Sequence, residues 1–351
     1  MHVPDGFLDV PTSLATAAVA AGAVGLGLQR ASREVREAGA PMAGLAAAFV
    51  FAAQMVNFPV GPGTSGHLMG GALAAVLVGP WTGLLAVAVV LVVQALLFAD
   101  GGLTALGTNI TLMAVVTVAV GYLATKALLT ILPRRPASVV PAAAVGAFVS
   151  VPAAALVFTG LYAAGGAVGI PLGTLATAML AWHTVIGVGE AVITATVVGA
   201  VVATRPDLVF VARRMRPDLV LLDAEGRATT VRPEQAPATR PGTRPLATLL
   251  AASLVVAGGV SLLASGHPDG LEFVGERLGF AGAARDSATG VSPFADYGTA
   301  GLGEVGGTVL AGVLGVLVTL ALGLGVAALA RRRRQPEPQQ PTEHDAQRTG
   351  G

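Results

Sequence analysis

The chain has 351 residues, of which 54% are hydrophobic and only 12% charged, and its formal net charge is +1. Soluble domains carry about a quarter charged residues, so this composition excludes an ordinary soluble enzyme. The 47 glycines and few aromatic residues are typical of transmembrane helices that pack closely through small side chains. The near-neutral charge gives no indication of nucleic-acid binding. Because the chain has no cysteine, any metal site must use nitrogen and oxygen ligands.

The first nine residues do not have the pattern of a secretory signal. They contain no Arg or Lys before the first apolar run, and no small-residue cleavage site follows them. His2 is a large residue, which disfavours removal of Met1 by a methionine aminopeptidase. We therefore expect Met1 to be retained with a free amino group.

Apolar stretches of about 20 residues, the length that crosses ~30 Å of hydrocarbon, recur along the chain. The pattern predicts an all-α integral membrane protein with nine transmembrane spans. The seventh span is long, and Gly187 and Gly189 suggest an interruption or a tilt within it. The expected spans are residues 11–28, 41–59, 64–79, 82–99, 104–125, 139–162, 172–203, 246–265 and 303–330.

The basic residues are distributed unevenly between the segments that connect these spans. If the segment with Arg30, Arg33 and Arg36 lies inside, alternation through nine spans places every Lys and Arg inside except Arg277 and Arg285. Lys and Arg concentrate in cytoplasmic loops. We therefore expect the N-terminus outside the cell and the C-terminus inside.

Two polar segments divide the chain into units. Residues 205–245 are rich in Pro and Arg, which predicts an exposed cytoplasmic linker. This linker separates a seven-helix unit, residues 1–204, from a two-helix hairpin unit, residues 246–330. Residues 331–351 are basic and then rich in Gln and Pro, which predicts a disordered cytoplasmic tail.

The start of the chain places a terminal amine beside an imidazole. The Met1 amine and the His2 backbone nitrogen can close a five-membered ring on a metal ion, and that nitrogen and His2 Nδ1 a six-membered ring. Such a planar nitrogen set is typical of Cu²⁺ or Ni²⁺, with Co²⁺ a weaker candidate, whereas Mg²⁺ and Ca²⁺ prefer oxygen. His67 lies in a Gly-rich segment after the second span, on the same expected side, and is the candidate fourth ligand.

Three segments then carry a resemblance to a known family: MHVPDGFL at residues 1–8, GHL at residues 66–68 and HTVIGVGEAVIT at residues 183–194. They resemble the CbiM/NikM substrate-binding membrane components of energy-coupling-factor transporters for cobalt and nickel. The resemblance implies a metal held by the Met1 amine, by the amide and imidazole nitrogens of His2, and by His67.

The two-helix unit carries a second resemblance. Residues 268–272 read PDGLE and residues 293–297 read PFADY. These motifs resemble the small accessory component called CbiN or NikN, which is here fused to the first unit in one chain.

The resemblance implies capture of Ni²⁺ or Co²⁺ outside a bacterial cell, by a multi-pass protein of the inner (plasma) membrane, for ATP-driven import. The sequence leaves the choice between the two ions open. The chain has no Walker A sequence, so ATP hydrolysis would fall to separate CbiO/NikO-like ATPase subunits joined through a CbiQ/NikQ-like transmembrane coupling subunit. On this interpretation the chain itself is not an enzyme, has no prosthetic group and is surrounded by membrane lipid.

Four further polar residues are candidates for supporting the site. Glu190 is the only acidic residue well inside a span, and His183 lies two helical turns before it on the same face. The two either form a buried hydrogen-bonded pair that clamps helices, or orient His67 or the N-terminal tail. Asn57 and Asn109, near outer helix ends, either satisfy loop backbone or hold the tail over the site.

Three alternative functions follow from the same residues. A secondary cation transporter or channel would use Glu190 and His183 as a proton relay, and it would need neither an ATPase nor a free N-terminus. An intramembrane hydrolase is disfavoured because a nucleophile and the zinc-protease spacings are missing. A purely structural subunit would depend on neither His2 nor His67.

Overall fold

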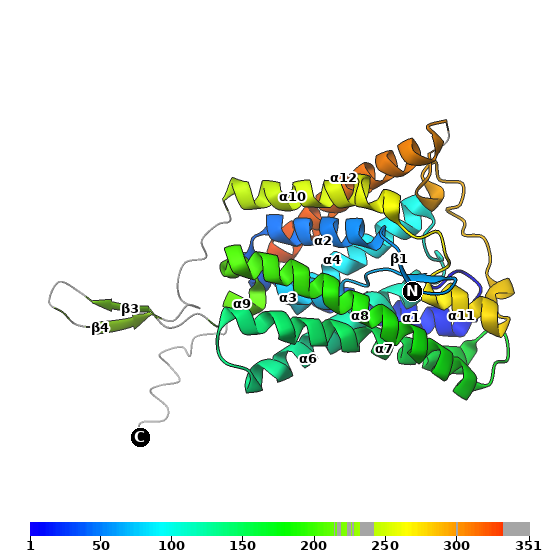
Figure 1. The fold of residues 1–351 in the computed structure, drawn as a ribbon, viewed down its shortest axis with the longest axis horizontal. Coiled ribbons are helices and arrows are strands. Elements are labelled where there is room, and N and C mark those ends of the chain that lie inside the picture. The colour runs from blue at the N-terminus through cyan, green and yellow to red at the C-terminus, as the bar shows by residue number, and fades with distance from the viewer. Residues whose placement is uncertain are drawn as a thin grey trace, which may run out of the picture.

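The computed structural model describes residues 1–213, 215, 219–222, 226, 228–231, 242–299 and 301–332. These parts of the chain are almost entirely helical, which confirms the expected all-α class (Figure 1). The strands within them form two short antiparallel hairpins: β1 (Phe58–Gly61) with β2 (Thr64–Gly66), and β3 (Leu219–Leu222) with β4 (Ala228–Val231).

The first unit contains α1 (Val10–Ala38), α2 (Ala40–Gln54), α3 (Gly71–Val78), α4 (Pro80–Val93), α5 (Leu106–Asn109), α6 (Thr117–Ile131), α7 (Val139–Gly165), α8 (Leu172–Thr204) and α9 (Phe210–Arg213). Short π-helical or 3-10 turns lie between them: η1 (Gln94–Phe98), η2 (Ile110–Val116), η3 (Pro136–Ser138) and η4 (Pro206–Leu208). The second unit contains α10 (Thr243–Gly258), η5 (Val260–Leu263), α11 (Gly270–Leu278), η6 (Ala281–Ala283), η7 (Ala295–Tyr297) and α12 (Gly303–Arg332).

Within the described residues, seven helical stretches are long and apolar enough to cross a membrane, so the chain is a multi-pass membrane protein. The second and third expected spans correspond to α2, with 15 residues, and α3, with eight. Both are short because residues 55–70 leave the helical path and form the β1–β2 hairpin and its flanking loops. The seven stretches are Val10–Ala38, Pro80–Phe98, Leu106–Ile131, Pro136–Gly165, Leu172–Thr204, Thr243–Leu263 and Gly303–Arg332.

Helix α8 runs without a break through Gly187 and Gly189, so the interruption expected there is absent. The two glycines serve close packing instead. A Cβ at Gly187 would lie 2.9 Å from the backbone oxygen of Phe148, and a Cβ at Gly189 would overlap the ring of Phe58. Small residues of this kind let membrane helices approach each other closely.

The two units pack against each other. Helices α10 and α12 lie along α2 (Figure 1), and α12 also contacts α1 and α4. Glycines make this approach possible: a Cβ on Gly323 of α12 would lie 3.0 Å from the Cα of Gly44 on α2, and a Cβ on Gly315 would overlap the ring of Phe51. The second unit is therefore a part of the helical bundle.

The start of the expected linker is packed, whereas an exposed segment was predicted. Leu208, Val209 and Phe210 are buried, and α9 lies against α3, because this run is apolar although the segment around it is polar. Helix α10 begins at Thr243, before the expected boundary at residue 246. Most of residues 214–241 lie outside the described residues.

Helix α12 continues through Arg332, so the first two residues of the expected tail are helical. Residues 333–351, the remainder of that predicted disordered tail, lie outside the described residues. The N-terminus and α11 lie at one end of the bundle, and α9 lies at the opposite end (Figure 1).

Candidate metal centre

The N-terminal tail, residues 1–9, is drawn into the bundle. The side chains of Met1, Val3 and Phe7 are each at most 4% exposed. Asn109 fixes the tail with two hydrogen bonds: it accepts one from the Val3 amide at 2.7 Å and donates one to the Val3 carbonyl at 3.1 Å. The expected role of Asn109 in holding the tail thus has a direct geometric basis.

Asp5 makes a second attachment of the tail. Its carboxylate accepts hydrogen bonds from the backbone amides of Leu103, Thr104 and Ala105, at 3.1, 2.7 and 3.1 Å. The second unit holds the tail from its other side, since the Arg285 amide donates to the Asp5 carbonyl at 2.8 Å. Both units therefore fix the position of the first residues of the chain.

The Met1 amine lies beside His67, as the chelate hypothesis requires. The distance from the amine nitrogen to His67 Nε2 is 2.5 Å. The His67 ring is oriented by Nδ1, which lies 2.9 Å from the Leu68 carbonyl. A carbonyl only accepts, so Nδ1 carries the proton and Nε2 presents its lone pair to the amine.

An acidic residue that was not predicted completes this contact. The Asp269 carboxylate places Oδ2 2.6 Å from the Met1 amine and 3.5 Å from His67 Nε2. Burial alone raises the pKa of this carboxyl, but the Met1 ammonium and His67 outweigh it and hold the pKa well below its usual range. Asp269 is therefore an anion against the candidate ligands.

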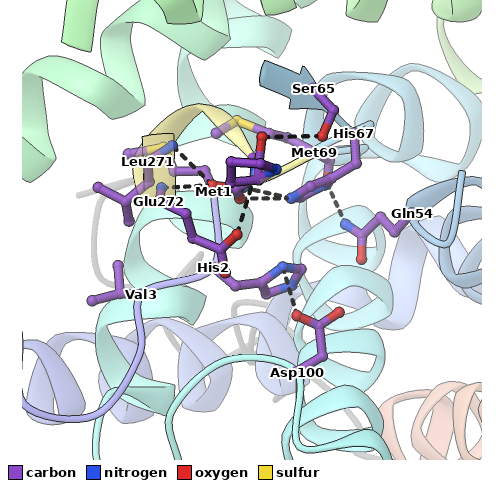
Figure 2. A network of polar contacts seen from close by, with 12 residues as sticks. Met1, His2, Val3, Gln54, Ser65, His67, Met69, Asp100, Leu271 and Glu272 are labelled. Carbon is purple, nitrogen blue, oxygen red and sulfur yellow. Dashed lines mark hydrogen bonds and ion pairs between the residues drawn. The ribbon is translucent and has the colours of Figure 1, made fainter. Parts of the chain in front are cut away.

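The His2 side chain lies in a separate polar network (Figure 2). Its Nδ1 is 3.1 Å from Asp100 Oδ1 and its Nε2 is 3.2 Å from Gln94 Oε1. The ring also stacks on His67, with centroids 4.9 Å apart. Burial lowers the pKa of His2 to about 4, although the nearby Asp100 acts in the opposite direction. Burial thus favours the neutral imidazole, the form that binds metals.

Tyr297 connects this network to the second unit. Its hydroxyl donates to Asp100 Oδ2 at 2.6 Å and accepts from Gln94 Nε2 at 3.2 Å. Burial, reinforced by the Asp100 charge, raises the pKa of Tyr297 well above its usual value, so the hydroxyl stays protonated. A polar cavity of about 540 Å³, lined by residues of both units, lies beside His2 and Asp100.

Glu190 and His183 do not bond to each other, so the expected hydrogen-bonded pair is wrong. Glu190 accepts from the backbone amides of Met69 at 2.6 Å and Gly70 at 2.9 Å, and so fixes the segment that carries His67. His183 donates from Nδ1 to a carbonyl of its own helix at 2.8 Å. Its Nε2 has no hydrogen-bond partner among the described residues.

For Asn57 the structure shows a contact through the backbone. Its backbone carbonyl accepts from the Ser265 amide at 2.7 Å, and the residue lines the polar cavity. In the described part of the chain, no group of three or more His, Asp or Glu side chains is arranged to hold a metal ion.

Asp269, Asp100, Gln94 and Tyr297 are the residues of this region that sequence reasoning missed. The only signal for Asp269 was its place in the PDGLE motif, and for Asp100 its place directly after a span. Neither pattern indicates a contact with Met1 or His2, because those contacts arise only when the second unit and the loop after η1 pack around the tail.

Both parts of the chain are similar to known proteins. Residues 2–208 match the family described as CbiM, cobalt uptake substrate-specific transmembrane region, and residues 243–332 match the PDGLE domain. A putative fused nickel transport protein NikMN of Archaeoglobus fulgidus is 33% identical over 92% of this chain and 96% of its own length. A cobalt transport protein CbiM of Sorangium cellulosum is 38% identical over 35% of this chain and 56% of its own.

A solved structure is similar as well. The crystal structure of a truncated transition metal transporter matches 58% of this chain and 99% of its own length, with a TM-score of 0.51 and 30% identity. The likeness extends over the greater part of the chain.

Proposed function

Since the chain belongs to the CbiM family of cobalt-uptake substrate-specific transmembrane proteins and continues into a PDGLE domain, we propose that it captures Ni²⁺ or Co²⁺ outside the cell for import. The membership makes it a membrane component of metal transport. Beyond family membership, we propose which ion is bound, which atoms bind it, on which side of the membrane it is captured and what supplies the energy.

The ligands we propose are the Met1 amine, the backbone and Nδ1 nitrogens of His2, and His67 Nε2. Metal–nitrogen bonds of about 2.0–2.1 Å put neighbouring corners of a square about 2.9 Å apart. The 2.5 Å between the Met1 amine and His67 Nε2 is close to this spacing. That contact is the observation that carries the proposal.

Binding of the ion requires one local rearrangement. His2 Nδ1 lies against Asp100, and a metal-bound Nδ1 cannot keep that contact. The ring therefore turns from Asp100 toward the ion, while the His2 amide loses its proton. The ion is a substrate of the transport process, and it leaves when these bonds are broken.

The position of the N-terminal tail supports the proposed orientation. The tail and the polar cavity lie at one end of the bundle, and the Arg-rich linker begins at the other (Figure 1). We place the tail outside, count α2 and α3 among nine spans, and assign residues 1–204 and 246–330 to the two domains. The linker and residues 331–351 then lie inside a bacterial plasma membrane.

Energy would come from partner proteins. We propose that the chain is the substrate-specific component of an energy-coupling-factor importer, with a CbiQ/NikQ-like coupling subunit and CbiO/NikO-like ATPases. The chain is then a transport subunit without enzymatic activity of its own. The proton-relay alternative has less support, because Glu190 is bonded to backbone amides and His183 to a carbonyl of its own helix, so no hydrogen bond joins the two side chains.

Equilibrium metal binding to the purified chain tests the proposal. We expect one Ni²⁺ or Co²⁺ ion per chain, and we expect His67→Ala to abolish this binding. The matched control is His267→Ala, which removes an exposed imidazole of the second unit. Equal binding by the His67→Ala variant and the parent chain would contradict the proposed site.

A further inference from the structure

Asp269 is held in place by contacts that do not involve the candidate ligands. It is the N-cap of α11, where Oδ1 accepts from the Leu271 amide at 2.8 Å and the Glu272 amide at 3.0 Å. The residues before it are fixed to β2: the Ser65 amide donates to the Pro268 carbonyl at 2.9 Å, and Ser65 Oγ to the His267 carbonyl at 2.7 Å. Oδ1 of Asp269 thus caps the helix, and Oδ2 is free to face the candidate metal centre.

The position after Asp269 is a glycine that lies close against α8. A Cβ on Gly270 would lie 2.6 Å from Ile186 Cδ1 and 3.4 Å from His183 Cε1, both on α8. The backbone of the PDGLE segment therefore lies directly on the helix that supports the His67 segment. This fixed backbone and the helix cap together orient Oδ2 of Asp269 toward Met1 and His67.

Three potential ligand atoms already form a compact triangle. The Met1 amine is 2.5 Å from His67 Nε2, Asp269 Oδ2 is 2.6 Å from the amine, and Oδ2 is 3.5 Å from His67 Nε2. Atoms bound to one ion at about 2.0–2.2 Å lie about 2.9–3.5 Å apart when the angles between the bonds are 90–110°. The triangle needs only small shifts to become one face of a coordination polyhedron.

The charges lead to the same assignment. A divalent ion bound to a deprotonated His2 amide carries one remaining positive charge, and His2 and His67 are neutral ligands. A buried net charge is costly unless a counter-charge lies beside it. Asp269, 8% exposed, supplies one negative charge at the centre. Asp100, whose side chain is 25% exposed, lies on the far side of His2 at the polar cavity.

We propose that Asp269 is a fifth ligand of the transported ion and binds it through Oδ2. The four nitrogens of the proposed function occupy the corners of a square, so the oxygen takes the apical position above the ion. The PDGLE domain thereby contributes an atom to the metal site of the seven-helix domain. This inference rests on the proposed function and defines its ligand set more closely.

The absence of cysteine from the natural chain allows a direct test. In the purified full-length Asp269→Cys variant, a thiolate replaces the carboxylate, and X-ray absorption of bound Ni²⁺ or Co²⁺ should show one sulfur neighbour at about 2.3 Å. The matched control is Glu272→Cys, which places a thiol on the same helix and also disrupts the α11 capping box. The control should show only nitrogen and oxygen neighbours.

A second variant covers the case in which Asp269→Cys does not fold. Asp269→Asn keeps the helix cap and the side-chain volume but loses the charge. We expect it to retain one ion per chain with an affinity at least about tenfold lower and an altered X-ray absorption edge for the bound ion, whereas Glu272→Gln should match the parent chain.

The outcomes separate this inference from the proposed function. If a folded Asp269→Cys chain binds one ion without a sulfur neighbour, the inference is wrong, whatever the affinity. If that variant does not fold, an unchanged edge in Asp269→Asn has the same meaning. If the parent chain binds no ion at all, the proposed function itself fails.

Discussion

Extension of the chain by one residue before Met1 should abolish high-affinity metal binding. An added Met is a suitable extension. The second residue of the extended chain is then also Met, which is large, so a methionine aminopeptidase should not remove the added residue. The extension converts the Met1 amine into an amide and moves the new amine by one residue. It thereby removes the positive group that lies 2.6 Å from Asp269 and 2.5 Å from His67.

The magnitude follows from the burial of this contact. The Met1 side chain is 1% exposed and that of Asp269 is 10% exposed, so solvent does not replace the lost ammonium. Removal of one partner of a buried ion pair costs about 3–5 kcal/mol, which corresponds to a factor of roughly 10² to 10³ or more in the docking of the tail. Metal affinity should fall at least as far, because the chelate also loses its terminal nitrogen.

The assay is a competition titration of the purified chain with Ni²⁺ and Co²⁺, together with metal uptake by cells that express it. The control adds the same residue after Gly351, and mass spectrometry verifies both termini. A chain extended before Met1 that binds within about threefold of the parent would refute the chelate. It would also restore the proton-relay alternative, which does not need a free N-terminus.

Three further predictions concern protons and the supports of the site. Metal affinity should fall as pH falls, by up to about two orders of magnitude per pH unit. The reason is that binding displaces one proton from the Met1 ammonium and one from the backbone amide of His2. The His2 imidazole has a pKa of about 4, so it releases no further proton near neutral pH. A flat competition titration between about pH 6 and 7.5 would contradict this. Asn109→Ala removes two hydrogen bonds to the tail, worth about 2 kcal/mol together, so affinity should drop roughly 30-fold in the same titration. Glu190→Gln weakens two buried bonds to residues 69–70 and should destabilise the chain by about 1–3 kcal/mol, seen as a lower Tm, whereas Glu304→Gln at an exposed position should leave Tm unchanged.

The proposed chelate could be predicted from the sequence because its chemistry is local. The amine, amide and imidazole belong to two consecutive residues, so ring closure follows from covalent geometry alone. Hydropathy and the distribution of basic residues then placed His67 on the same expected side as Met1. The structure brings the Met1 amine and His67 Nε2 within 2.5 Å, although they are 66 residues apart.

The short second and third helices show where hydropathy fails. Phe58, Leu68 and Met69 are apolar, and windows of about 20 residues counted them as parts of spans. Leu68 and Met69 are in fact loop residues buried inside the protein, with the backbone amide of Met69 bonded to Glu190. Hydropathy reports burial away from water, and it does not distinguish burial in lipid from burial in protein.

The fused second unit contacts Met1 directly and is connected to His2 through Asp100. No local sequence pattern could predict these contacts. Asp269 lies against the Met1 amine, and Tyr297 donates to Asp100, which in turn holds His2. An ion that binds His2 Nδ1 must break the contact between His2 and Asp100. It thereby changes the surroundings of Asp100, which also accepts a hydrogen bond from Tyr297. Because coupling between two binding events is reciprocal, the fit of the second unit around the tail and the affinity for the ion must depend on each other. A chain that carries both units in one polypeptide keeps these contacts at a fixed stoichiometry.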